Sequence, residues 1–393
     1  MDKETLSNYG WIVILVLVLA VMLALASPFG NFIAGAIKAT TAGLFGVNQS
    51  ALNAGGITIP GQSFEETDDN ITPDSEWIPG LYQTGSNYTV LIKSWDDLIA
   101  DGAITINDGT LLGVKENFSM LAGDLRIARN VSTIGYSAFN KCNELTGVSI
   151  PNTLLVVGQD SFHYAKGIQH VEFEANSSVH TIDYEAFVMT TALEKITIPK
   201  SVVTLDGRAF MFSGIKSCDF EEGSLCTSIG NSAFYECKQL QSVYIPKSVK
   251  LIDTYAFAWS KAITNITIES GSELETIGDY AFCITSLTEF TVPKSVKTIG
   301  YQAFAGVSTL TTLDFEGNSV CTKIGGQAFG SCSALVNLYI PASIQSIDSN
   351  AFSGCTFTEF DYGGSESDWQ AITIGSYGND AIKNATIHYN VVK

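Results

Sequence analysis

Charged residues are scarce in this sequence, and basic residues are scarcer than acidic ones. Of its 393 residues, 16% are charged, and 21 Lys and Arg stand against 40 Asp and Glu, which gives a formal net charge of −19. Nucleic acids and anionic lipid surfaces are bound through Lys and Arg, so this balance argues against both as partners. The hydrophobic fraction of 46% suits a packed core and argues against general disorder.

Motifs of the common enzyme and metal classes are missing as well. No H-E-x-x-H, C-x-x-C, G-x-x-x-x-G-K-[ST] or G-x-S-x-G occurs, so zinc, redox, nucleotide and nucleophilic-serine sites have no support. Of four histidines, His163, His170 and His180 lie near one another in the chain but lack metal-ligand spacing. We interpret them as surface histidines. We therefore expect no enzyme, no metal site and no cofactor.

What the sequence has instead is a unit that recurs ten times around a phenylalanine, which follows an alanine in every copy but one, where Ser161 precedes Phe162. One copy reads SIGNSAFYEC at residues 228–237. Its phenylalanines lie 22 to 25 residues apart, at Phe139, Phe162, Phe187, Phe210, Phe234, Phe257, Phe282, Phe304, Phe329 and Phe352. A period of this length indicates a solenoid, in which each coil contacts only its neighbours.

Each repeat has a second fixed feature shortly after its phenylalanine, an apolar–polar–apolar triplet such as Val243-Tyr244-Ile245. Such alternation of β-branched and aromatic residues predicts a short half-buried strand. A leucine-like residue three positions earlier, as at Leu240, completes the strand pattern of a leucine-rich repeat. We therefore predict a leucine-rich-repeat solenoid with one parallel strand per coil and returns made of turns or short helices. Every second strand ends at a proline, which lacks an N–H and stops the ladder.

Eight cysteines could suggest a disulfide framework, but their positions favour another role. Four of them follow a repeat phenylalanine by three residues, at Cys142, Cys237, Cys332 and Cys355. Other repeats carry Ala165 or Ser213 at the same position. We predict that these cysteines are small, buried side chains with free thiols.

The N-terminal region holds an apolar run, Trp11–Ala26, without a charged or polar side chain. It is shorter than the roughly 20 residues of a typical membrane-spanning helix, although the chain stays largely apolar to Lys38. Two hypotheses stay open, a retained anchor helix and a signal peptide cleaved after Ala26. The absence of a basic segment before the run favours the anchor. The stretch from Asn8 to Thr41 resembles the hydrophobic segment of tad-type pilins, which also has a Tyr-Gly pair before its apolar run.

The chain divides by composition into five segments. They are an N-terminal hydrophobic anchor helix (1–38), a linker or stalk rich in Thr, Gly, Asn, Ser and Pro (39–86), an N-terminal cap (87–120), the solenoid (121–362) and a C-terminal cap (363–393). Within the N-terminal cap we predict a strand over Tyr88–Lys93, a helical turn from Ser94 and a tight turn at Asn107-Asp108-Gly109.

The unit L-x-x-I-x-I-P-x-S-V-x-x-I-G-x-x-A-F-x-x-C, seen from Leu240 to Phe257, resembles the BspA-like leucine-rich repeat family. The resemblance covers about residues 120–362, and the tail from Trp369 to Tyr389 is similar to a segment that often closes its members. These are mostly surface proteins of host-associated bacteria and some protists. The resemblance therefore implies adhesion to a host protein, a neighbouring cell or an extracellular polymer. Repeat cysteine is missing from six of the ten coils, and there is no obvious C-terminal sorting signal.

The candidate binding face is the row of side chains that project outward from the concave face of the sheet, one from each strand. From this row we select six candidate ligand-binding residues, Glu172, Asp219, Tyr244, Asp314, Tyr339 and Asp361. The acids would favour a cationic partner, and the two tyrosines are of the type enriched at binding hot spots. Tyrosine also suits an exposed strand by propensity alone, so both interpretations stay open.

Two functions follow for the whole chain. In the first, a protein or polymer ligand lies along the sheet of a cell-surface adhesion protein, which is anchored in the membrane by the N-terminal helix or secreted if cleaved after Ala26. In the second, the pilin-like segment assembles into a homo-oligomer, and the solenoid is displayed by a structural subunit.

Overall fold

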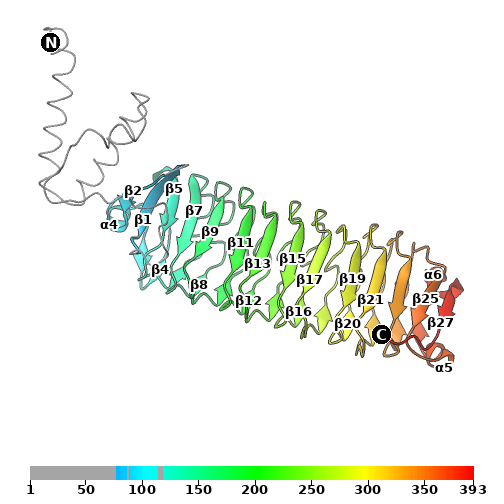
Figure 1. Cartoon of the computed structure of the whole chain (residues 1–393). Coiled ribbons are helices and arrows are strands. Elements are labelled where there is room, and N and C mark those ends of the chain that lie inside the picture. The colour runs from blue at the N-terminus through cyan, green and yellow to red at the C-terminus, as the bar shows by residue number, and fades with distance from the viewer. Residues whose placement is uncertain (1–76, 86–87, 114–117) are drawn as a thin grey trace, which may run out of the picture. The chain divides into compact units, whose positions relative to one another are not determined.

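The computed structural model describes residues 77–85, 88–113 and 118–393 (Figure 1). The predicted anchor helix (1–38), with its pilin-like resemblance, and most of the predicted linker lie outside these ranges. Strand β1 (Gly80–Gly85) lies at the end of that linker, so strand structure begins before the predicted boundary at residue 87. Every helix among the described residues is too short or too polar to cross a membrane.

The chain divides into two compact units. The described part of the first comprises Trp77, Tyr82–Gly85 and Tyr88–Ser94, and it contains β2 (Tyr88–Ser94) as predicted. The second comprises Ile78–Leu81 and Trp95–Lys393, and it contains the solenoid.

The second unit begins with the elements predicted for the N-terminal cap. The helix α4 (Trp95–Ala100) is followed by the antiparallel hairpin of β3 (Ile106–Asn107) and β4 (Thr110–Leu111). The hairpin turn has φ of 46° at Asp108 and 70° at Gly109, the positive values that a tight two-residue turn requires. A 3-10 turn, η1 (Phe118–Leu121), leads into the first long strand.

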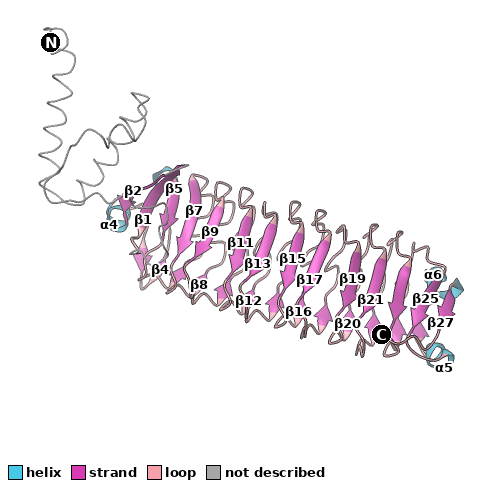
Figure 2. Ribbon diagram, viewed as in Figure 1, coloured by secondary structure: helices cyan, strands magenta, loops and turns pink. Residues whose placement is uncertain are grey.

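Each coil contributes one long strand to a parallel sheet, as predicted (Figure 2). The long strands are β5 (Gly123–Arg126), β7 (Leu145–Ile150), β9 (His170–Phe173), β11 (Lys195–Ile198), β13 (Ser217–Phe220), β15 (Ser242–Ile245), β17 (Asn265–Ile268), β19 (Glu289–Val292), β21 (Thr312–Phe315), β23 (Asn337–Ile340) and β25 (Glu359–Tyr362). Equivalent residues of successive coils stack in register, as Tyr244 does with Thr267. The leucine-rich-repeat solenoid predicted from the sequence is therefore confirmed.

The returns differ in detail from the predicted turns or short helices. Each contains a two-residue strand formed at the Ile of the repeat unit, and these strands build a second sheet that continues through the array. They are β6 (Thr133–Ile134), β8 (Val156–Val157), β10 (Thr181–Ile182), β12 (Thr204–Leu205), β14 (Ser228–Ile229), β16 (Leu251–Ile252), β18 (Thr276–Ile277), β20 (Thr298–Ile299), β22 (Lys323–Ile324) and β24 (Ser346–Ile347). A strand of two residues is too short for alternation to predict.

The sheet of long strands is interrupted once. Within the described residues, β17 is the last strand of one sheet and β19 the first strand of another, whereas the short strands β18 and β20 pair across the same place. The coils on either side are therefore joined at the short sheet and the turns, but not by a ladder of long strands.

The repeat phenylalanines form a continuous stack through the core. All ten are fully buried, and the ring centroids of successive members lie 5.1 to 5.4 Å apart. Distances of this size are favourable for aromatic pairs, so the stack adds to the stability that burial of the rings provides. The predicted burial of Phe234 is confirmed.

The turn around each phenylalanine repeats one backbone geometry. Residues two positions before and two positions after the phenylalanine have positive φ, for example 56° at Ser232 and 52° at Glu236 around Phe234. Alternate N–H groups donate to the next coil, as Phe234 N does to Ala256 O at 2.7 Å. This hydrogen-bond ladder holds the left-handed residues in place. We call the surface formed by the side chains two before, one after and two after each phenylalanine the turn face.

All eight cysteines are buried and free, which confirms the prediction for the four repeat cysteines. The structure adds a reason for their position. Cys237 Sγ donates to Phe210 O at 3.0 Å, and in the next coil Ser260 Oγ donates to Phe234 O at 2.7 Å. In these coils the position holds a small hydrogen-bond donor that satisfies a carbonyl of the preceding coil.

The alternation of proline-ended strands also has a physical basis. After Pro151, Pro199, Pro246 and Pro293, the backbone N–H that follows the proline donates to a glutamate of the next coil, as Lys200 N does to Glu221 Oε2 at 2.9 Å. The same bond joins Lys247 to Glu269 and Lys294 to Glu316. The repeating unit of the solenoid is therefore a pair of coils, one with the proline and the next with the glutamate.

The predicted C-terminal cap continues both sheets. Strand β26 (Thr373–Ile374) pairs with β24, and β27 (Thr386–His388) pairs with β25. The short helices α5 (Glu366–Gln370) and α6 (Asp380–Asn384) connect them, and α5 begins with a capping box formed by Ser365 and Asp368.

Candidate functional site

The predicted row of outward side chains lies on the face of the long sheet. Glu172 is exposed on β9, and Tyr244 on β15 exposes 36% of its surface. Asp219, Asp314 and Asp361 are half-buried. Five of the six candidate residues therefore reach solvent from this face.

Tyr339 does not, because it is only 8% exposed. The C-terminal residues cross the sheet and cover it, with Lys393 Nζ 5.2 Å from the centre of the Tyr339 ring. Hydrogen bonds from Asn390 N to Gly364 O and from Val391 N to Tyr362 O hold this segment in place. Burial raises the pKa of Tyr339. The prediction of Tyr339 as an exposed anchor is wrong, because a segment more than fifty residues later in the sequence covers its strand.

The acidic character of the row is also smaller than the sequence implied. Lys195 Nζ lies 2.9 Å from Asp219 Oδ2, and Lys393 Nζ lies 2.8 Å from Asp314 Oδ2. Two of the four acids are therefore already neutralised by an ion pair. Among the described residues, no ion pair involves Glu172 or Asp361, and these two carry the unbalanced charge of the row.

A pocket of about 240 Å³ lies at the C-terminal end of the row. It brings together Asp314, Tyr339 and Asp361 with Asn337, Glu359, His388 and Lys393. His388 Nε2 lies 3.4 Å from Glu359 Oε2. The other three candidates, Glu172, Asp219 and Tyr244, lie outside this pocket on earlier strands. The pocket contains acidic and basic side chains as well as hydrogen-bond donors and acceptors. This lining suits a polar or zwitterionic group of a larger ligand.

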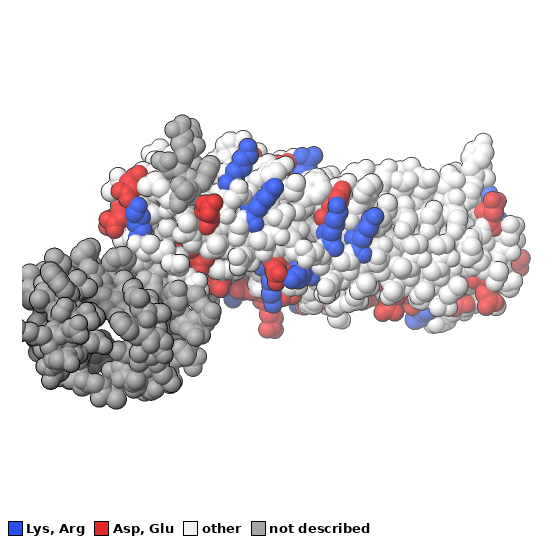
Figure 3. Space-filling view, turned by 90° about the horizontal axis from the view of Figure 1, so that it is seen from above, with Lys and Arg blue, Asp and Glu red and all other residues white. Residues whose placement is uncertain are grey.

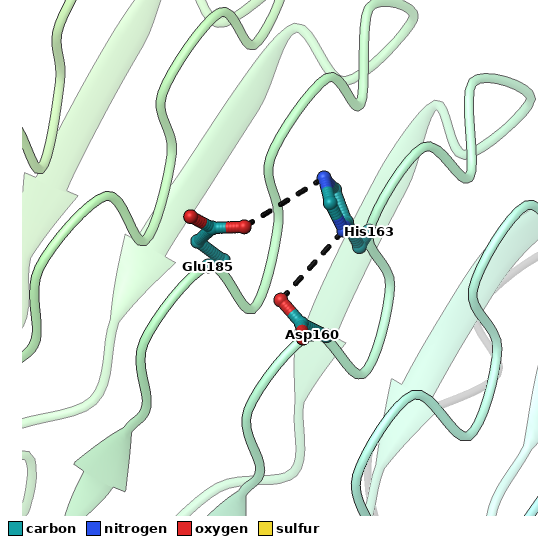
Figure 4. A group of neighbouring side chains, drawn as sticks. All are labelled: Asp160, His163 and Glu185. Atoms are coloured by element: carbon teal, nitrogen blue, oxygen red, sulfur yellow. Dashed lines mark ion pairs between the residues drawn. The ribbon is translucent and has the colours of Figure 1, made fainter.

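The histidines do not meet as a set, but one of them lies in a charged cluster on the turn face (Figure 4). His163 Nδ1 lies 3.6 Å from Asp160 Oδ1, and His163 Nε2 lies 3.8 Å from Glu185 Oε2. One ligand atom from each residue lies within 4.8 Å of the others, so the three could hold a metal ion. His170 pairs instead with Asp124, and His180 contacts Thr181.

The surroundings of this cluster favour an ion-pair network. Burial raises the pKa of Asp160. Burial also acts to raise the pKa of Glu185, but hydrogen bonds from Arg208 and Tyr184 outweigh it and lower that pKa. Arg208 Nη1 lies 2.9 Å from Glu185 Oε1, so a positive charge already occupies one side of the cluster. A second cation there would meet repulsion from Arg208.

The sequence analysis did not single out this cluster, because its members come from two coils. Asp160 and Glu185 stand two residues before their phenylalanines, and His163 stands one residue after. Aligning the repeats on the phenylalanine and comparing those columns would have placed the three together.

Charge is unevenly distributed along the solenoid. Seen from above, the surface carries several Lys and Arg toward the N-terminal end and is mostly uncharged over the C-terminal coils (Figure 3). The residues that follow the repeat phenylalanines show the same change. Lys141, Lys166, Lys216, Lys238 and Lys261 are exposed there in earlier coils, whereas 283–288, 305–311, 330–336 and 353–358 contain no charged residue.

Comparison with known families gives a match over most of the solenoid. A family model described as the BspA type leucine rich repeat region matches residues 119–225 and 227–359, in six copies. A search of curated proteins found no match.

Several solved structures are similar to the chain. A leucine-rich repeat protein from Bacteroides ovatus ATCC 8483 is 18% identical, with 73% of this chain and 98% of that chain covered and a TM-score of 0.37. A leucine rich cell surface protein from Faecalibacterium prausnitzii A2-165 is 20% identical, with 75% and 97% covered and a TM-score of 0.37. The pneumococcal vaccine antigen PcpA is 19% identical, with 64% and 78% covered and a TM-score of 0.37.

Proposed function

This chain belongs to the BspA-type leucine-rich repeat family, and from that premise we propose that it is a cell-surface binding protein. Its long sheet would present one face to an extended partner, a host protein, a neighbouring cell or an extracellular polymer. The N-terminal hydrophobic segment (1–38) would anchor the chain in the membrane. No role as an enzyme is proposed.

The observation that carries this proposal is the regular row of outward side chains on a hydrogen-bonded sheet. Because the strands stack in register, the row repeats at the spacing of a sheet, about 4.8 Å. Side chains held in this way lose little conformational freedom when a partner binds, which favours affinity. An elongated row also fits an extended ligand better than a small molecule.

Within the row, the exposed Tyr244 is the strongest candidate for an anchor. Its ring is the largest exposed side chain among the six candidates, and it lies between Asp219 on β13 and the exposed Thr267 on β17. Burial and the hydrogen bond that its phenol makes with Glu269 raise its pKa. The unpaired carboxylates of Glu172 and Asp361 would attract basic groups of the partner.

The test begins with the full chain in mild detergent, screened against an array of host matrix proteins and polymers. For a ligand found this way, Tyr244→Ser should weaken binding by about 2 kcal/mol, roughly thirtyfold, with an unchanged melting temperature. Thr291→Ser, in the same row, is the matched control and should leave binding intact. Full affinity in Tyr244→Ser together with Glu172→Gln would show that the ligand binds elsewhere.

A further inference from the structure

The turn face carries a row of aromatic residues in the middle of the solenoid, half-buried at Tyr235, Tyr255 and Tyr280 and exposed at Trp259. Tyr255 and Tyr280 stack with ring centroids 4.5 Å apart, and Tyr235 stacks on Trp259 at 6.2 Å. Tyr301, which lies next to the turn face, three residues before Phe304, contacts Tyr280 edge to face at 5.4 Å. Trp259 is 41% exposed. These rings lie outside the buried phenylalanine stack, so the core does not account for them.

Several of these large side chains are attached to backbone positions that rarely carry large residues. Tyr255, Trp259, Tyr280 and Ile284 have φ of 58°, 65°, 57° and 56°. Bulky and β-branched residues rarely adopt positive φ, because the side chain crowds the backbone. At equivalent positions some other coils have large residues as well, such as Phe212, but several have residues that suit this geometry better, namely Ser232, Gly306, Ser331, Asn350 and Gly354. The fold therefore does not require large side chains at these positions.

Next to the aromatic row lies a groove of about 380 Å³. Trp259, Tyr280 and Ile284 form its apolar wall. Its floor consists of the small residues Ala305, Gly306, Gly330, Ser331 and Ser353 from three successive coils. A volume of this size lies in the usual range for ligand sites.

Two amide side chains line the groove, Gln302 and Gln327. Gln327 Oε1 accepts hydrogen bonds from Tyr301 Oη at 2.6 Å and from Gln302 Nε2. Among the described residues, no hydrogen bond is made by Gln327 Nε2 or by Gln302 Oε1. The pair therefore fixes its own orientation and leaves amide N–H donors and the Gln302 Oε1 acceptor available, and a hydroxyl group can bond to both kinds.

The lining of this groove contains no charged residue, in a chain with a net charge of −19. Its one thiol, Cys283, is buried, and burial raises its pKa to about 11, so it too is neutral at physiological pH. A cationic or anionic partner would find no counter-ion here. Apolar ring faces beside free amide groups match a ligand that has apolar C–H faces and many hydroxyls.

We propose that this groove binds a neutral glycan chain, with its sugar rings against Trp259 and Tyr280 and its hydroxyls on Gln302 and Gln327. The floor runs along the solenoid over three coils, so a linear oligosaccharide would lie parallel to the solenoid axis. This site is on the turn face and does not depend on the function proposed for the sheet face.

The experiment is isothermal titration calorimetry of the full chain in mild detergent with cellohexaose, xylohexaose and mannohexaose, and with hexagalacturonic acid as a charged counterpart. We expect a Kd below about 1 mM for at least one neutral hexasaccharide and at least tenfold weaker binding of the acidic one. No binding of any neutral oligomer would overturn the proposal. Equal binding of the acidic oligomer would do so as well, because the argument rests on the uncharged lining.

Two substitutions test the location without disturbing the backbone. Trp259→Gly and Gln327→Ser introduce residues that other coils have at the same positions, Gly306 and Ser232, so both variants should fold. Each should weaken glycan binding at least tenfold. Tyr136→Ser, which removes a 69% exposed tyrosine from the first coil, is the matched control and should change nothing.

Retained affinity in both variants would overturn the site. If sedimentation instead shows that the chain self-associates and that Trp259→Gly abolishes the association, the groove is an interface between copies, and the glycan proposal is wrong. Tyr244→Ser should leave glycan binding unchanged. Failure of the sheet-face function and failure of this site can therefore be told apart.

Discussion

Two rows of aromatic residues run along this solenoid a few residues apart in the sequence, one inside and one outside. The inner row is the stack of ten phenylalanines, all fully buried and evenly spaced. The outer row, with Tyr235, Tyr255, Trp259 and Tyr280, occupies only some coils, and all of its members but Tyr235 have positive φ, which is unfavourable for large side chains. Regularity in the first row reflects the requirements of folding. The outer row is present in only some coils, which indicates a role other than folding. Substitutions in the inner row should therefore lower the stability of the fold much more than substitutions in the outer row.

The largest difference is expected within one repeat. Phe234→Ala removes a ring from the core stack and should lower the free energy of unfolding by about 3 to 5 kcal/mol. Tyr235→Ala, at the next residue on the turn face, should lower it by less than about 1 kcal/mol. Denaturant melts of both variants measure the difference. Equal losses would show that the outer row also stabilises the fold.

A similar contrast is expected between two tyrosines of the sheet. Tyr339 lies beneath Lys393, so Tyr339→Ser should lower the free energy of unfolding by about 2 kcal/mol. Tyr244→Ser, at the equivalent position of an earlier strand, should cost less than about 1 kcal/mol. Thermal melts would detect this difference. A stable Tyr339→Ser variant would mean that the C-terminal segment does not cover the sheet in solution.

The inner region should also respond to alkaline pH. Burial raises the pKa of Cys237 and of Cys142 from the ordinary value of 9.0 to about 12. The unfolded chain therefore loses these protons at lower pH than the folded chain does. The resulting stability is fully present below pH 9 and is lost as the pH rises toward 12.

This loss is measured by denaturant melts between pH 8 and 11, and Cys237→Ser is the matched control. Serine stands at the same position in Ser213 and Ser260, so the variant should fold and show a smaller loss. At pH 8, a thiol reagent should modify Cys142, Cys237, Cys332 and Cys355 only after unfolding. Rapid labelling of the native chain would contradict their burial.

The smallest effect is expected on the turn face, at a residue beside the outer row. Ile284 is β-branched and has a φ of 56°, whereas asparagine adopts this geometry readily. Ile284→Asn should therefore raise the free energy of unfolding by about 0.5 kcal/mol and weaken binding of a neutral hexasaccharide. Ser331→Asn, at the same position two coils later, should have no effect on stability. A clear destabilisation by Ile284→Asn would show that the side chain is needed for packing.

The sequence was sufficient for features that recur with the repeat. The phenylalanine period and the triplet around Tyr244 predicted the coils, the long strands and the buried thiols, because a core position needs the same kind of side chain in every coil. The two-residue strands were not predicted, because two residues are too few to show an alternation of apolar and polar side chains. The outer aromatic row and the cluster of Asp160, His163 and Glu185 were not predicted, because the residue types at these positions vary from coil to coil.

Long-range contacts were outside the reach of pattern analysis. Lys393 neutralises Asp314 from 79 residues away, and no periodic feature connects the two. Of the six candidate site residues, three meet in one pocket with residues of the C-terminal cap, and one of those three is buried. Which outward positions remain free depends on where a non-repeating segment folds.

The interruption of the long sheet between β17 and β19 has a mechanical consequence. An array held together by parallel ladders of hydrogen bonds is expected to open first where one ladder is missing, so a force on the solenoid would separate the coils at this interruption. The groove on the turn face extends across this seam, with Trp259 preceding β17 and Tyr280 preceding β19. A chain bound in that groove would contact coils on both sides of the interruption and resist their separation. The solenoid would then withstand a larger force with the groove occupied than with the groove empty.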